Sequence, residues 1–119
     1  MSEAYDKLAK QYEEILQGRR IGVGVGWYDL LSDYLDKLSK IDPDVKIMDI
    51  KEKFGTLRIF AMSENPDASD EVFELERIIE DRSGEICEEC GDSGHSRDGG
   101  WIRTLCDECQ DYYNKRKRI

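Results

Sequence analysis

Cys87-Glu-Glu-Cys90 and Cys106-Asp-Glu-Cys109 decide the fold of the last third of this chain, and fifteen residues separate the two pairs. Two residues between paired cysteines allow one tight turn of backbone to direct both sulfur atoms at a single ion. Two such pairs at this separation are typical of a zinc site. Four thiolates also fill a tetrahedral coordination sphere, so we expect one structural Zn²⁺ bound by Cys87, Cys90, Cys106 and Cys109.

Two disulfides, or four inert thiols, are the alternative for these cysteines. Disulfide frameworks belong to secreted chains, whereas this chain begins Met-Ser-Glu without an apolar signal segment. No stretch approaches the length of a membrane span, so the sequence predicts a cytoplasmic protein with no membrane partner. His95, the only histidine, is an alternative ligand, although both cysteine pairs are complete without it.

The residues around the cysteines predict a treble-clef-like or ribbon-like finger. Gly91 suits the positive φ that the turn after the first pair needs, and the glycine-rich segment from Gly94 to Gly100 can turn the chain back. A helix is expected to start at the second pair and to end in the basic run from Lys115 to Arg118. Trp101 and Ile102 are expected to form the small apolar support of the finger.

Upstream of the finger, hydrophobic periodicity predicts three helices. Apolar residues recur at steps of three and four near Glu3 to Gln17, Trp27 to Leu38 and Asp70 to Arg82. Gly18 is expected to end the first helix, and Ser69 is expected to cap the last one. The first helix is expected to pack on its own domain, and a mobile helix that grips a partner's groove is the alternative.

Alternating apolar residues from about Val45 to Met62 predict two antiparallel strands joined near Lys53 to Thr56. Met48 and Ile50 interrupt the alternation, which allows a bulge in the first strand. The chain is therefore predicted to be α+β, a small helical body with a β-hairpin and the zinc finger. Its three parts are an N-terminal amphipathic helix (1–18), the body (19–84) and the finger with its basic C-terminal helix (85–119).

Alternate glycines in Arg19-Arg20-Ile-Gly-Val-Gly-Val-Gly26 suggest a phosphate-binding loop ahead of a helix. The pattern does not meet the requirements of such a loop. A dinucleotide fingerprint needs glycine where Trp27 stands, and no Lys-Ser/Thr pair follows. We therefore expect this segment to be a flexible linker or turn.

Three runs of sequence resemble a widespread group of small bacterial and prophage-associated hypothetical proteins. They are Gly26-Trp-Tyr-Asp-Leu-Leu, then Ile50-Lys-Glu-Lys-Phe-Gly-Thr-Leu-Arg-Ile-Phe, then Cys87-Glu-Glu-Cys-Gly with Gly94-His-Ser-Arg-Asp-Gly-Gly-Trp-Ile-Arg-Thr-Leu-Cys106. The group often has histidine where this chain has Cys109, and either residue can bind zinc. The resemblance implies an association with phages or mobile elements, and it implies no particular activity.

The charge of the chain distinguishes between protein binding and nucleic-acid binding as hypotheses for its function. The formal net charge is -9, so the surface is predominantly acidic, which disfavours a general nucleic-acid-binding protein. On the third helix, Glu74, Glu76, Glu80 and Asp81 make the exposed side acidic. Solubility is one explanation of this face, and a docking surface for a basic partner is the other.

We expect a non-catalytic protein that binds a protein partner, as an adaptor or inhibitor of a host nucleic-acid-processing or defence complex. The alternative is a nucleic-acid-binding finger, whose candidate residues are Arg97, Trp101, Arg103, Lys115, Arg116, Lys117 and Arg118. A histidine-metal nuclease would have to use His95 and Asn114, and one histidine leaves a catalytic metal short of ligands. A zinc deaminase needs a His-x-Glu element before the first cysteine pair, which the chain lacks.

Overall fold

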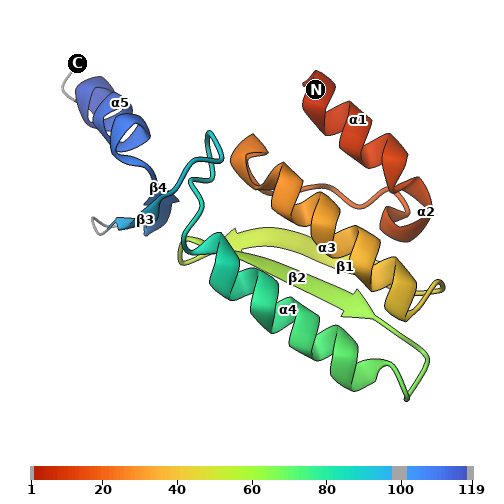
Figure 1. Cartoon of the computed structure of the whole chain (residues 1–119). Coiled ribbons are helices and arrows are strands. Elements are labelled where there is room, and N and C mark those ends of the chain that lie inside the picture. The colour runs from red at the N-terminus through yellow and green to blue at the C-terminus, as the bar shows by residue number, and fades with distance from the viewer. Residues whose placement is uncertain (1, 98–101, 118–119) are drawn as a thin grey trace.

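Helix α3 (Tyr28–Ile41) and helix α4 (Ser69–Ser83) pack against a hairpin of two antiparallel strands, β1 (Lys46–Lys53) and β2 (Thr56–Met62). The structure is a computed structural model that describes residues 2–97 and 102–117. Figure 1 shows the hairpin behind α3, with α4 along β2 and the C-terminal finger beyond the hairpin turn. The remaining elements are α1 (Glu3–Gln11), α2 (Glu13–Leu16), the 3₁₀ helix η1 (Val25–Trp27), β3 (His95–Arg97), β4 (Arg103–Leu105) and α5 (Asp107–Lys117). The chain is α+β, as predicted.

The core lies between α3 and the hairpin. Leu31, Leu35 and Leu38 follow one another at helical spacing and are completely buried. They meet the buried face of the strands, where Ile50 and Ile59 are cross-strand partners. The apolar stripe that identified the second helix in the sequence is therefore the centre of the fold.

The hairpin has the predicted position and contains the bulge that the sequence allowed. Its register shifts between Ile47 and Asp49, so Met48 is the extra residue. The two-residue turn consists of Phe54, at φ 55°, and Gly55, at φ 81°. Both values lie in the left-handed region, which two-residue hairpin turns require and glycine or asparagine adopt most easily.

Helix α4 covers the outer edge of β2 with polar side chains. The Leu57 N–H donates to Ser83 Oγ at 2.7 Å, and the Ala61 N–H donates to Glu76 Oε1 at 3.1 Å. These bonds satisfy backbone donors that an edge strand otherwise exposes. The prediction that Ser69 caps α4 is wrong, because Ala68 occupies the cap position and Ser69 is the first helical residue.

The N-terminal segment forms two helices where the sequence predicted one. The break falls at Tyr12, whose hydroxyl donates to Asp36 Oδ1 at 2.6 Å and lies 2.8 Å from Ser32 Oγ. Ile15 and Leu16 belong to the same core as α3. The segment therefore packs on its own body, as expected.

The prediction of a flexible linker before α3 is wrong. The Gly22 N–H donates to Ile50 O at 3.1 Å, so the segment adds a parallel bridge to the open edge of β1. A Cβ atom on Gly22 would lie 2.6 Å from that oxygen. The alternate glycines allow close backbone contact inside this chain, a requirement that composition alone does not distinguish from flexibility.

We predict that Phe54→Asn stabilises the protein by about 1 kcal/mol, because asparagine tolerates positive φ better than a bulky side chain does. Phe54 is 64% exposed, so its replacement removes little buried area. Urea denaturation of the zinc-loaded protein measures the change. Phe73→Asn is the matched control, since Phe73 is 69% exposed but lies within α4, where asparagine is disfavoured. Equal destabilisation by both changes would contradict this account of the turn.

Candidate metal centre

Four sulfur atoms gather where the finger meets the body. Ligand atoms of Cys87, Cys90, Cys106 and Cys109 all lie within 4.8 Å of one another. Cys90 Sγ and Cys106 Sγ are 3.6 Å apart, close to the separation of about 3.8 Å for thiolates around a tetrahedral zinc ion. All four cysteines are free, so the four-thiol arrangement of the sequence analysis is present and the disulfide alternative is not.

The first cysteine pair is shaped by backbone hydrogen bonds. The Gly91 N–H donates to Cys87 O at 2.9 Å, and the Cys87 N–H donates to Asp92 O at 2.7 Å. Gly91 has φ 87°, which confirms the role predicted for it. The turn closed by these bonds places Cys87 and Cys90 on the same side of the chain.

The second pair lies at the junction of β4 and α5. Strands β3 and β4 are antiparallel, with His95 opposite Leu105 and Arg97 opposite Arg103. Cys106 follows β4 directly, and Cys109 lies in the first turn of α5. The Cys109 N–H points at Cys106 Sγ, 3.4 Å away. Turn, hairpin and ligand-bearing helix thus follow one another in the predicted order.

The surroundings of Cys87 favour its thiolate. Burial alone would raise its pKa, but backbone N–H groups of Cys106, Cys90 and Glu89 outweigh burial and lower it to about 7. Burial and neighbouring thiols raise the pKa of Cys109. A divalent cation supplies the positive charge that four adjacent thiolates need, and soft sulfur ligands in a tetrahedron suit Zn²⁺. The residues present therefore fit one metal ion.

His95 lies outside this group of sulfur atoms. Its side chain is 67% exposed, and its Nε2 is 3.8 Å from Asp107 Oδ1. The same carboxylate accepts a hydrogen bond from Arg97 at 2.7 Å. Asn114, the other residue of the nuclease hypothesis, accepts a hydrogen bond from the Gln110 side chain on α5.

The finger is fastened to the body next to the metal site. Trp27 is completely buried, and its Nε1 donates to Ile86 O at 2.8 Å. The Gly26 N–H donates to Glu88 O at 2.7 Å, while the Thr104 hydroxyl donates to Gly55 O. The segment between the first two cysteines therefore contacts η1, just ahead of α3, and β4 contacts the turn between β1 and β2.

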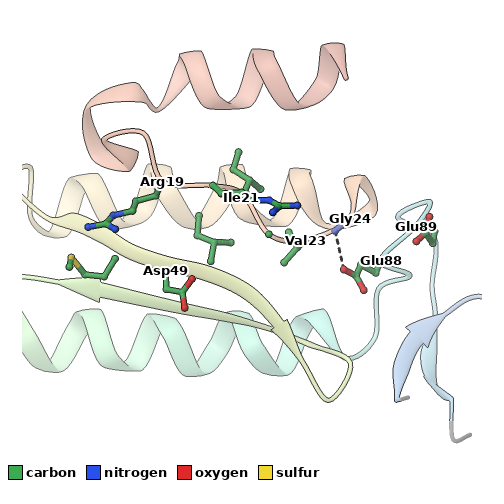
Figure 2. A pocket seen from close by; sticks show the side chains of 11 residues that line it. Arg19, Ile21, Val23, Gly24, Asp49, Glu88 and Glu89 are labelled. Atoms are coloured by element: carbon green, nitrogen blue, oxygen red, sulfur yellow. Dashed lines mark hydrogen bonds between the residues drawn. The ribbon is translucent and has the colours of Figure 1, made fainter. Parts of the chain in front are cut away.

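Glu88 is a site residue that the sequence analysis did not predict. The Gly24 N–H donates to Glu88 Oε2 at 2.9 Å, as the dashed line in Figure 2 shows. Burial raises the pKa of this carboxyl. Its partner lies 64 residues earlier in the chain, and no local pattern relates the two. The position of Glu88 inside a Cys-x-x-Cys pair was the only available signal.

A groove of about 710 Å³ runs between residues 19–24 and the open edge of β1, towards Glu88 and Glu89. Figure 2 shows Arg19 and Asp49 towards one end and the two glutamates at the other. Both cations and carboxylates therefore line it. This mixed lining does not single out one class of ligand.

The structure places the predicted nucleic-acid-binding residues in two different environments. Arg97 donates to Leu105 O at 3.0 Å, and Arg103 donates to Glu89 Oε1 at 2.6 Å and stacks on Tyr113. Both arginines are thus engaged within the finger. The exposed cations of α5 are Lys115 and Arg116. Trp101, Arg118 and the side chain of Lys117 lie outside the described residues.

The acidic residues of α4 that were predicted to bind a partner do not form one surface of unpaired carboxylates. Glu74 pairs with Arg77 at 2.6 Å, and Glu80 pairs with Arg58 of β2 at 2.9 Å. Glu76 points to the backbone of β2, where burial raises its pKa. Asp81 is exposed.

Comparison of the chain with models of protein families, with curated proteins and with solved structures found no match. Among the described residues, none of the helices has the length and apolar character needed to cross a membrane.

We predict that the purified protein binds one Zn²⁺ and that Cys90→Ser lowers the metal content to less than half, because three thiolates leave the site incomplete. Native mass spectrometry counts the metal. Circular dichroism and proteolysis then report whether the segment from Cys87 onwards loses its fold. One retained zinc with unaltered melting would rule out the site. Ser93→Ala is the control, since Ser93 is an exposed residue near the pair that contributes no sulfur.

We also predict that Gly26→Ala weakens zinc binding at least about tenfold, although Gly26 is not a ligand. A Cβ atom there would lie 2.2 Å from Cys87 O, so the first cysteine pair would have to shift. Competition with a chromogenic zinc chelator measures the affinity. Gly84→Ala is the matched control, because its nearest neighbour would be 3.4 Å from the new atom. Unchanged affinity in Gly26→Ala would show that the finger tolerates displacement from the body.

Proposed function

We propose that this protein is a non-catalytic, zinc-stabilised binding module that acts on a protein partner in the cytoplasm. Four sulfur ligands leave the metal no open position for water or substrate, which supports a structural role. The metal would then contribute folding free energy, because the finger has little apolar core of its own. In this proposal Zn²⁺ fixes the shape of the protein, and recognition is carried out elsewhere on its surface.

The observation that carries partner binding is a group of exposed apolar side chains over one groove. Phe60, Met62 and Phe73 are 57%, 49% and 69% exposed, and all three line the groove between β2 and α4. Burial within the chain explains none of them. Exposed apolar residues that gather in one place mark protein interaction sites more often than isolated ones do. This is the feature a binding module needs and a metalloenzyme does not.

The resemblance to prophage-associated proteins supports a partner of host origin, such as a nucleic-acid-processing or defence complex. Under this proposal the protein is a phage- or mobile-element-encoded adaptor or inhibitor. A nucleic-acid contact through Lys115 and Arg116 of α5 is the second candidate, since both side chains are exposed. The two candidates differ in what remains bound after nuclease treatment and at high salt.

The test is affinity capture from a bacterial host lysate with the zinc-loaded full chain, followed by native mass spectrometry with and without nuclease. We expect a stoichiometric protein complex that survives nuclease treatment. A complex that disappears with nuclease, and with neutralisation of Lys115 and Arg116, would favour the second candidate. Metal-dependent cleavage of a nucleic acid by the purified protein would contradict the non-catalytic proposal.

A further inference from the structure

The hairpin has an open face whose composition differs from that of the whole chain. Cross-strand partners point to the same side of a sheet, so the register places the side chains of one set of residues together. One side carries the buried pair Ile50 and Ile59 and packs into the core. The opposite, open side carries Lys46, Asp49, Lys51, Lys53, Thr56, Arg58, Phe60 and Met62.

This open face is locally positive although the protein is acidic. Its strand residues include four Lys and Arg residues and one carboxylate, that of Asp49, and Glu80 of α4 pairs with Arg58 at its edge, whereas the chain as a whole has 18 basic and 27 acidic residues. Charges of one sign that gather on one face attract a surface of opposite sign. The sign of the net charge therefore does not describe this face.

The ion pairs on the face are exposed and exchangeable. Lys51 Nζ is 3.6 Å from Asp49 Oδ2, with side chains 58% and 52% exposed. Arg58 pairs with Glu80 at 2.9 Å, with side chains 39% and 34% exposed. Pairs at this exposure contribute roughly 0–1 kcal/mol, so a partner's carboxylates can replace them at little cost.

The apolar residues lie within this charged surface. Phe60 is the cross-strand partner of Asp49, and Met62 is the partner of Lys46. Beside them, the groove between β2 and α4 continues to Val72 and Phe73, and Glu76, which accepts a hydrogen bond from the Ala61 N–H, also lines it. An apolar centre with a charged rim is the usual organisation of a protein interface.

We propose that the open face of the hairpin, with the adjoining groove, binds a segment of another protein whose apolar side chains are flanked by carboxylates. This inference rests on the proposed function and specifies the partner's chemistry. It reverses the charge relation expected from composition, in which the acidic surface of this chain docks on a basic partner.

A protein segment fits the face better than a nucleic acid does. Met62 and Phe73 border a groove that can receive apolar side chains, whereas stacking of successive bases needs several aromatic faces in a row. Among the described residues of the two strands, Phe60 is the aromatic side chain on this face. Two of the four cations already contact carboxylates, an arrangement that a partner's carboxylates can reproduce.

The experiment selects peptides from a random dodecapeptide display library on the immobilised, zinc-loaded full chain. We expect the enriched peptides to combine Asp or Glu with Phe, Leu, Ile or Trp. Synthetic versions of these peptides should lose at least about tenfold in affinity on Phe60→Ser and on Lys51→Glu, measured by fluorescence anisotropy. Zinc content and circular dichroism establish that each variant is folded.

The chain offers a matched control for each variant. Tyr112 on α5 is 57% exposed, as Phe60 is, so Tyr112→Ser removes an equally exposed aromatic ring. Lys37 on α3 pairs with Asp33 and is 54% exposed, against 58% for Lys51, so Lys37→Glu makes the same charge reversal elsewhere. Both controls should bind the peptides with unchanged affinity. Equal losses in a control and its matched variant would overturn the proposal.

Four outcomes would also overturn it. Enrichment of basic peptides, lost on Glu74→Lys, would assign binding to the acidic helix face. Tight binding of a single-stranded oligothymidylate that Lys51→Glu abolishes would make the face a nucleic-acid site. No enrichment would contradict the proposal that this face binds peptides.

A host protein complex that persists with Phe60→Ser would contradict binding at this face and leave the proposed function intact. Absence of any complex in the wild type would contradict the proposed function itself.

Discussion

The contact of residues 24–26 with the backbone between Cys87 and Cys90 is the constraint on which the rest of the structure depends. The Gly26 N–H binds Glu88 O, and the Gly24 N–H binds the Glu88 carboxylate. These bonds join η1, which leads into α3, to one half of the candidate metal site. Because Trp27 is buried immediately afterwards and binds Ile86 O, a displacement of the cysteine pair would also displace a core residue. The metal site and the hydrophobic core therefore share one piece of backbone.

This arrangement explains why so small a finger can be ordered. Among its described residues from 85 onwards, Leu105 is the one buried aliphatic side chain, and Thr104 and Glu88 are buried polar groups. Such a segment buries too little apolar surface to offset its loss of conformational entropy. A metal ion bound by the four thiolates would supply the missing free energy. Contacts with Gly55 and Gly26 join the finger to the body, so metal binding would also stabilise the body.

Elements with a local pattern were predictable from the sequence. The stripe of Leu31, Leu35 and Leu38 identified α3, the alternation around Phe54 identified the hairpin, and the cysteine spacing identified the four ligands. Apart from the position of the α4 cap, the failures concern partners far apart in the chain. Tyr12 breaks the first helix while binding Asp36, and Gly22 binds Ile50 where a flexible linker was expected. Nothing within a few residues of Tyr12 or Gly22 encodes those partners.

Charge shows the same difference between composition and arrangement. Helical spacing places the acidic residues of α4 on one side, which made a docking face one explanation of them. In the structure, Glu74 and Glu80 pair with arginines, and Glu76 accepts a hydrogen bond from the β2 backbone. The cations of the hairpin form no pattern in the sequence, because single lysines between apolar residues are typical of solvent-facing strand positions. Pairing of the strands brings these cations around Phe60. Charges separated by more than a Debye length of about 8 Å are largely screened, so a docked partner interacts mainly with the charges nearest to it. Strand register, which sets those nearest charges, therefore matters more than net charge for the sign of partner proposed for this face.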